Sequence, residues 1–294
     1  MIWTRRDFFK GALLTGGASF ASAGVGLYSY AIEPCRIKQT DYVLNSKKWP
    51  EDMGPLTIAA AGDFHVGCPS VDLTALDGIV DRLNALSADI IFLLGDFLIK
   101  GVRGGTYVPP EPIAEKLSRL KAPLGVVAVL GNHDWWRDGR GMWKALEKVG
   151  IQVLENSAVP VLRNTKTFWV AGLADDTTRT PDIKKALAGV KDDAPVIMLS
   201  HDPAPFVNMV DRPVITLCGH THGGQVAIPF IGPIIIPGRA PMKYAYGHIE
   251  EEGRDMIVTS GLGTSILPVR FNRRPEIMKI TLSSPSAISR GALI

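Results

Sequence analysis

Six short apolar runs, most of which end in or run into glycine, place the strongest constraint on the fold of this chain. They occupy residues 56–62, 89–95, 122–131, 168–173, 195–200 and 213–219. Each run has the length of a buried β-strand. Between them, apolar side chains recur at helical spacing over residues 71–86, 109–120 and 139–150, which predicts helices. Alternation of strands and helices predicts an α/β domain.

The pattern changes after Gly223. Residues 225–238, 243–263 and 276–282 read as strands joined by glycine turns, so we expect an antiparallel extension there. The run IGPIIIPG at 231–238 is unusually apolar, and it predicts a buried hairpin, with contact to a lipid or a membrane as the alternative. We expect a connector with one strand at 33–54, the main domain at 55–283 and a loose tail at 284–294.

Composition excludes several classes of function. With 32 basic and 29 acidic residues in 294, the chain is nearly balanced in charge, and no nucleic-acid partner is expected. Arg270, Arg273 and Arg274 form a basic cluster that faces an anionic ligand or belongs to a solvated loop. Three scattered cysteines do not make a disulfide framework.

The amino terminus, residues 1–32, has the features of an export signal. Arg5 and Arg6 precede two phenylalanines and a lysine, and residues 11–32 carry no charge. This start resembles a twin-arginine signal. It implies passage through the twin-arginine translocase to the periplasm or the outer face of the inner membrane. Cleavage at the small residues 21–23 and retention as an anchor both remain open, as does an ordinary membrane anchor.

Polar residues follow five of the predicted strands at once. They are Asp63 and His65, Asp96, Asn132 and His133, His201, and finally His220 and His222. In an open α/β sheet the carboxyl ends of the strands are where ligands bind, so we expect these side chains to meet at one edge. Buried charges must be paired or bound to metal, which favours a functional site over five unrelated hydrogen bonds.

The types of side chain in this set limit which metal ions can bind. Imidazole, carboxylate and amide oxygen without thiolate suit Mn, Fe, Zn, Ni or Co. Seven candidate ligands are too many for one ion but fit two divalent ions that share a carboxylate. Such a pair lowers the pKa of a bridging water to near neutrality and polarises a phosphoryl group, which makes that water the expected nucleophile at phosphorus.

Five motifs in this order carry a resemblance to a known family: GDFHVG, GDF, GNHD, SHDP and GHTHGG, spanning residues 62–224. They closely resemble the calcineurin-like metallophosphoesterases. The resemblance implies a four-layer α/β/β/α sandwich with two mixed β-sheets flanked by helices, and a hydrolase with two divalent ions, for which Mn is the expected assay metal. Together with the ending GLGTSILPVRFNRRPEI, the twin-arginine start resembles a subgroup of exported or membrane-attached bacterial phosphodiesterases.

The resemblance also implies a role for each candidate residue. One ion would be held by Asp63, His65 and His222, the other by Asn132, His201 and His220, with Asp96 as the bridge. His133 would stabilise the transition state and protonate the leaving group, and Asp134 would either orient it or make a loop hydrogen bond. The residues directly after His133 are expected either to line the entrance of the site or to pack against the protein core; they are Trp135, Trp136 and Arg137. The candidate substrate contacts are Arg137 and Arg273.

The expected function is therefore hydrolysis of a phosphodiester or pyrophosphate bond at the bacterial cell envelope. A lipid-linked pyrophosphatase of the UDP-2,3-diacylglucosamine hydrolase type is an alternative, as is a phosphomonoesterase or protein phosphatase. A non-catalytic module that binds a phosphorylated ligand is a further alternative of another class. A proton donor such as His133 favours an enzyme over that module.

Overall fold

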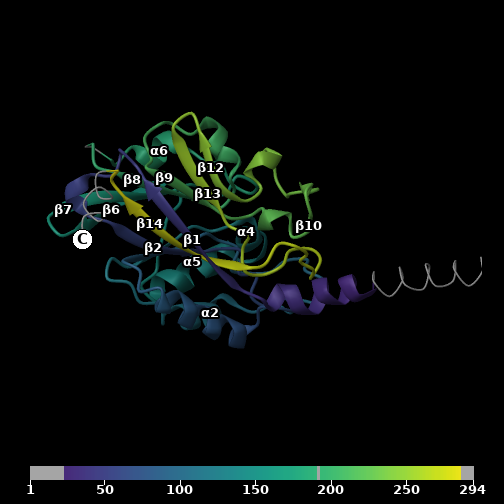
Figure 1. Ribbon diagram of the computed structural model, residues 1–294. Coiled ribbons are helices and arrows are strands. Elements are labelled where there is room, and N and C mark those ends of the chain that lie inside the picture. Colours follow the sequence, from purple (N-terminus) through teal and green to yellow (C-terminus); the bar gives the residue numbers. More distant parts are fainter. Residues whose placement is uncertain (1–22, 191–192, 286–294) are drawn as a thin grey trace, which may run out of the picture.

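The computed structural model describes residues 23–190 and 193–285, and within them two six-stranded sheets lie face to face (Figure 1). The first sheet has the strand order β1-β14-β2-β3-β4-β5 and the second the order β12-β13-β9-β8-β7-β6. The first comprises β1 (Lys38–Asn45), β14 (Glu276–Ser283), β2 (Leu56–Ala61), β3 (Ile90–Leu93), β4 (Val126–Ala128) and β5 (Gln152–Val153). The second comprises β12 (Gly247–Glu251), β13 (Arg254–Val258), β9 (Ile215–Cys218), β8 (Val196–Ser200), β7 (Lys166–Gly172) and β6 (Ser157–Arg163).

The central strands are apolar on both faces because each sheet is covered on both sides. In β2, Ile58 and Ala60 pack between the two sheets, whereas Ala59 and Ala61 face the helices that cover the first sheet. Parallel strands buried on both faces read as continuous apolar runs rather than alternating ones. This explains why the sequence shows six apolar runs, and the predicted four-layer sandwich of two mixed sheets is confirmed.

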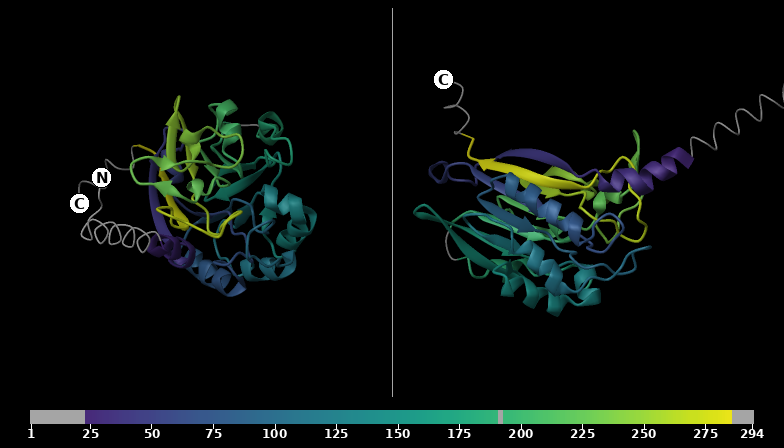
Figure 2. Two further views of the ribbon diagram at one scale, coloured as in Figure 1. Left: turned by 90° about the vertical axis from the view of Figure 1, so that its right-hand side faces the viewer. Right: turned by 90° about the horizontal axis from the view of Figure 1, so that it is seen from below.

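Helices on the outer faces complete the layers. The first sheet is covered by α2 (Leu73–Ala85), α3 (Pro110–Leu117) and α5 (Gly139–Lys148), close to the three predicted segments. The second sheet is covered by α6 (Ile183–Leu187) and by 3₁₀ turns at Ala204–Asn208 and Met242–Tyr244. Further views show these layers from two other directions (Figure 2). The short α4 (Asn132–Arg137) follows β4 in the sequence after a short loop, and it carries Asn132 and His133.

The chain after Gly223 is only partly an antiparallel extension. β12 and β13 form the expected hairpin, and β10 (Ala227–Ile228) pairs antiparallel with β11 (Gly232–Pro233). However, β13 pairs in parallel with β9, and β14 returns to the first sheet between β1 and β2. The expectation fails where β13 meets β9 and where β14 meets β1, because the side-chain pattern of a strand does not specify its neighbours; β13 is antiparallel to β12 and β14 is antiparallel to β2, as expected. Residues 33–54, expected to contain one strand, supply β1.

The segment 231–238 is not the buried hairpin that its composition predicts. Ile231 and Ile235 are each 74% exposed, Ile234 is largely exposed, and Phe230 just before them is fully exposed. The prediction of burial is wrong because the two sheets already fill the core without this loop.

The predicted amino-terminal export signal lies mostly outside the described residues, so residues 1–22 carry no structural account. Residues 23–32 are helical and continue into a 3₁₀ turn at Glu33–Cys35. Among the helices of the described residues, none combines the length and apolar character needed to cross a membrane.

Candidate metal centre

The side chains that follow the strands converge because their backbones take an unusual conformation. Asp63, His65, Asp96, His220 and His222 all have positive φ, between 42° and 69°. Such left-handed geometry is uncommon for residues other than glycine and is found chiefly at functional sites. It breaks the alternation of a strand, so His220 and His222 point toward the same region although only one residue separates them. The left-handed backbone at these five positions therefore directs their side chains into the site.

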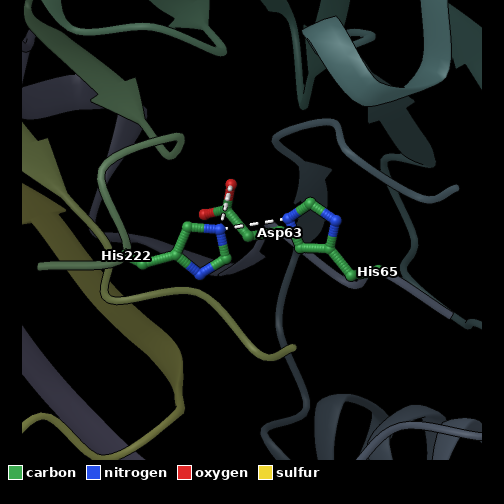
Figure 3. A group of neighbouring side chains, drawn as sticks. All are labelled: Asp63, His65 and His222. Atoms are coloured by element: carbon green, nitrogen blue, oxygen red, sulfur yellow. Dashed lines mark hydrogen bonds and ion pairs between the residues drawn. The ribbon is translucent and has the colours of Figure 1, made fainter. Parts of the chain in front are cut away.

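Three buried side chains form the first cluster, Asp63 and His65 after β2 and His222 after β9 (Figure 3). The Nε2 atoms of His65 and His222 are 3.0 Å apart, and Nε2 of His222 is 3.9 Å from Oδ1 of Asp63. Oδ2 of Asp63 is buried without a hydrogen-bond partner. Two imidazole nitrogens and a carboxylate oxygen that lie close to one another suit a divalent cation.

A second cluster lies beside the first and contains Asp96. Asp96, His201 and His220 offer donor atoms within ligand distance of one another, and Asp96 belongs to a further cluster with His65 and His133. Oδ2 of Asp96 is 3.5 Å from Nε2 of His65 and 3.3 Å from Nε2 of His201. That same nitrogen of His201 is 3.2 Å from Oδ1 of Asn132. A carboxylate between two donor groups fits a bridging ligand.

The close approach of these side chains requires glycine at two positions that border the site, Gly131 and Gly261. A Cβ on Gly131 would lie 2.3 Å from Oδ1 of Asp96 and 2.6 Å from the ring of His201. A Cβ on Gly261 would lie 2.6 Å from Cβ of Asp63. Glycine after the strands thus makes space for the ligands, while the histidines and aspartates themselves supply most of the turn.

The electrostatics of the site favour cation binding. Burial lowers the pKa of His65 and of His220 to about 3 and that of His222 well below its usual range, so these rings are neutral at neutral pH. Burial also raises the pKa of Asp63 to about 7, and the neighbouring charge of Asp96 adds to this. Neutral imidazoles and carboxylates that lack compensating charge are the state in which a metal ion binds. The donor set therefore fits divalent metal ions.

Hydrogen bonds fix the orientation of several donors. Nδ1 of His201 lies 2.7 Å from the carbonyl oxygen of Leu94, to which it donates, so Nε2 is the nitrogen that faces the site. Although burial opposes it, the negative charge of Asp96 raises the pKa of this ring well above its usual range. The backbone N–H of His220 donates to Oδ1 of Asp63. Oδ2 of Asp202 lies 3.5 Å from Nε2 of His220.

His133, on the first turn of α4, lies beside the donors of both clusters. Its ring centroid is 4.6 Å from that of His65, and it is almost fully buried. The backbone N–H of Lys100 donates to its Nδ1 over 3.2 Å, so the neutral ring carries its proton on Nε2. Oγ of Ser265 is 3.4 Å from that nitrogen. His133 thus holds a proton on the atom away from its backbone anchor.

Asp134 supports the loops around the site and does not orient His133. Its Oδ2 accepts hydrogen bonds from the backbone N–H of Asp96 and of Gly131, and its Oδ1 accepts one from Leu98. Of the two expectations for Asp134, the loop hydrogen bond is the one seen. It connects the strand end that carries Asp96 to the helix that carries His133.

Sequence reasoning placed Arg270 in a basic cluster but missed its position in the core. The side chain is fully buried, donates to the carbonyls of Ser260 and Gly263, and has a guanidinium nitrogen 3.4 Å from Nδ1 of His222. Burial lowers its pKa to about 10, which leaves it charged at neutral pH. No pattern in the sequence distinguishes it from its neighbours Arg273 and Arg274, since burial depends on the path of the whole loop.

The two arginines expected to contact substrate lie apart from the donors. Arg137 is exposed and stacks on Tyr107, with its Cζ atom 3.9 Å from the ring centroid. Arg273 donates from Nε to the carbonyl of Gly223 and stacks on Tyr246. It borders a separate cavity of about 490 Å³ near the amino-terminal helix. Their substrate contacts stay a prediction.

The two tryptophans that follow His133 lie in different surroundings: Trp136 is exposed beside the site, and Trp135 packs against the core. Trp136 is 45% exposed, with its ring centroid 5.1 Å from that of His133. Trp135 packs against the core beneath the helices and under Arg179. Trp136 is therefore the member of the pair that borders the donors.

Two mixed sheets with a histidine and aspartate cluster at the ends of their strands define a metal-dependent hydrolase fold. The family model of the calcineurin-like phosphoesterases matches residues 56–224, more than half of the chain, which contains every predicted ligand. The chain therefore belongs to the calcineurin-like metallophosphoesterases, as its motifs indicate, and it is a hydrolase.

Three curated relatives match nearly the full length. An uncharacterized metallophosphoesterase, YkuE of Bacillus subtilis, is 32% identical and covers 96% of this chain and 98% of its own. The phosphodiesterase YaeI of Escherichia coli is 26% identical over 95% of this chain and 99% of its own. The UDP-2,3-diacylglucosamine pyrophosphatase LpxG of Chlamydia trachomatis is 27% identical over 84% of this chain and 89% of its own.

Proposed function

We propose that the protein is a dinuclear phosphodiesterase that hydrolyses a phosphodiester or pyrophosphate bond at the bacterial cell envelope. The observation that carries this proposal is the position of Asp96, whose Oδ2 lies within 3.5 Å of His65 and within 3.3 Å of His201. One carboxylate thus serves two groups of donors. The similarity to YaeI supports a diester substrate. The paired arginines of the amino-terminal sequence support export by the twin-arginine route.

Each residue has one task in this proposal. Asp63, His65 and His222 would hold one ion, Asn132, His201 and His220 would hold the other, and Asp96 would contribute to both. When bound, the two cations supply charge to the phosphoryl oxygens and an activated water as nucleophile. Nε2 of His133 donates its proton to the departing alkoxide, and the backbone N–H of Lys100 keeps the ring in that tautomer. Asp134 fixes the loop that carries Asp96 relative to the start of α4 through its hydrogen bonds to both.

The test uses the purified full chain, Mn²⁺ and a glycerophosphodiester, whose departing alkoxide needs a proton. We expect His133→Ala to lower kcat by about a hundredfold or more without changing metal content, in the range for loss of a general acid. The chain offers a matched control. His248 is its only histidine outside the cluster, and it pairs with Asp255 on the surface of the second sheet. Equal rates for His133→Ala and His248→Ala would remove the assigned role.

A lipid-linked pyrophosphate is the second candidate substrate, and one observation favours it. An apolar cavity of about 430 Å³ has His222 in its lining, next to the first group of donors. The similarity to LpxG points the same way. We would compare kcat/KM for bis-p-nitrophenyl phosphate, p-nitrophenyl phosphate and UDP-2,3-diacylglucosamine. Preference for the monoester would overturn the diesterase assignment, and preference for the nucleotide-linked lipid would establish the second candidate.

A further inference from the structure

An exposed apolar loop projects from the protein beside the metal centre. The β10–β11 hairpin and the residues after it place Phe230, Ile231, Ile234 and Ile235 in solvent. The Phe230 side chain is fully exposed although its backbone takes the left-handed conformation, with φ of 66°. Single exposed apolar residues are ordinary, but a contiguous group marks an interaction surface.

A second loop adds to this group. Ile266 is 68% exposed, and Leu267 beside it is also exposed. Ile266 has φ of 61°, which is a rare and strained conformation for a β-branched residue. The fold thus accepts local strain while leaving an apolar side chain in water, which points to function rather than to stability. We call Phe230, Ile231, Ile234, Ile235, Ile266 and Leu267 the apolar rim.

The GHTHGGQ segment joins the rim directly to the metal centre. Nε2 of Gln225 donates to the carbonyls of Ser265 and Leu267, and its Oε1 accepts from the backbone N–H of Ser265. Oγ of Ser265 in turn lies 3.4 Å from Nε2 of His133. Between the two loops lies the cavity of about 430 Å³, and its lining runs from Ile234, Ile235 and Leu267 to His222. The rim therefore forms the outer edge of a groove that reaches the predicted ligands.

The amino-terminal helix leaves the protein at the same end. The backbone N–H of Arg270 donates to the carbonyl of Ser29 in that helix, and Phe271 exchanges backbone hydrogen bonds with Gln225 and Ala227 at the base of the hairpin. One segment thus joins helix and hairpin. Viewed from this end, the helix and the hairpin both face the reader (Figure 2, left). In the helix Leu27, Tyr30 and Ile32 are exposed.

The composition around the rim favours a lipid surface as its partner. None of the six rim residues is charged, and in sequence the residues 11–22 that precede the helix carry no charge either. Arg103, whose backbone donates to the carbonyl of Ile266, is exposed at the border of the rim. Apolar side chains flanked by a cation are typical of a surface that enters the interface of an anionic bilayer.

We propose that the apolar rim and the amino-terminal helix dock together on a lipid bilayer, with the groove open toward the membrane. The docking itself follows from the surface. Docking would also bring a phosphoester carried by a membrane lipid to the metal centre, and this consequence rests on the proposed function. Docking would place the scissile bond at the depth of the lipid headgroups, within reach of His133 and the predicted ligands.

The docking is tested with the full chain and needs no catalysis. Cys35 is the exposed cysteine, so a Cys35→Ser background allows Phe230→Cys to be labelled with the fluorophore NBD. Leu162→Cys is the matched control, because Leu162 is equally apolar and 65% exposed on β6, at the opposite side from β10 (Figure 1). With vesicles of phosphatidylethanolamine and phosphatidylglycerol, we expect NBD emission to rise and shift to the blue at position 230 but not at 162.

Three results would overturn the docking. One is an unchanged spectrum at position 230 in protein that sediments with the vesicles, which would leave the amino terminus as the sole attachment. Another is the same change at positions 230 and 162. The third is a change that needs no vesicles and grows with protein concentration, which would assign the rim to a second copy of the chain. None of these depends on the enzyme's activity, so a failure of the proposed function remains distinguishable.

The consequence for substrate is tested by comparing two diesters. The pair Phe230→Ser and Ile231→Ser, combined, should lower the rate on a p-nitrophenyl phosphatidyl diester in vesicles relative to the rate on bis-p-nitrophenyl phosphate. We expect this ratio to fall at least about tenfold, since two large apolar side chains no longer enter lipid. Leu162→Ser should leave the ratio as in the wild type. A ratio unchanged in the double variant would show that docking does not deliver substrate.

Discussion

Substitution of one glycine by alanine should abolish the metal centre without disturbing the backbone. Gly131 has φ of −106°, which alanine adopts freely, so Gly131→Ala changes only the space at Cβ. That carbon would lie 2.3 Å from Oδ1 of Asp96 and 2.6 Å from the ring of His201. Both the carboxylate of Asp96, which is the proposed bridge, and the imidazole of His201 must therefore move by about 1 Å to reach an ordinary van der Waals distance.

Such a shift is large on the scale of metal coordination. Ligand distances in metal sites hold to about 0.2 Å, so a displacement of about 1 Å removes a ligand from its ion. A misplacement of that size costs about a hundredfold in rate. We therefore expect Gly131→Ala to contain less metal by elemental analysis and to show kcat/KM at least about a hundredfold below the wild type.

Gly78→Ala is the matched control. Gly78 lies within α2, and a Cβ there would meet no atom within 4 Å. Alanine in a helix is favoured over glycine, so this variant should gain about 1 kcal/mol in the free energy of unfolding and keep full activity. Wild-type metal content and kcat/KM in Gly131→Ala would refute the steric argument and, with it, the placement of Asp96 and His201 around one ion.

Three further predictions concern the bridge, the buried arginine and the thiols. Asp96→Asn should lose at least one metal equivalent by elemental analysis, because an amide is a weaker bridge than a carboxylate; loss of none would contradict bridging. Arg270→Met leaves buried carbonyls without donors, so urea unfolding should show a loss of about 2–5 kcal/mol, against about 1 kcal/mol for the solvent-side Arg274→Met. Ellman's reagent should react rapidly with one thiol, Cys35, in the native protein and with three after unfolding; two or more fast thiols would contradict the burial of the others.

The strands and the donors could be predicted because both depend on local sequence. A strand buried on both faces needs an unbroken apolar run, and a site at the carboxyl edge needs its ligands directly after such runs. Hence Asp63, Asp96 and His201 could be located without coordinates. β6 (Ser157–Arg163) was missed because its residues are half exposed at the sheet edge and its apolar pattern is weak.

Features that depend on contacts between distant segments could not be predicted. Arg270 reads like Arg273 in the sequence, and only the fold around Gly263 and Ser260 shows that it is buried. Likewise, the exposure of Ile235 follows from a core already filled by other strands. The left-handed backbone at His220 and His222 could not be predicted either, since histidine adopts that conformation at only a minority of its positions.

The position of β14 has a consequence for how the chain is made. This strand lies between β1 and β2, and its last residue, Ser283, bonds Asn45 across 238 positions of sequence. Until β14 has left the ribosome, β1 has no neighbouring strand and the first sheet is incomplete. The domain therefore cannot reach its native form while β14 is still to be made, and the nascent chain must be kept from aggregating until then.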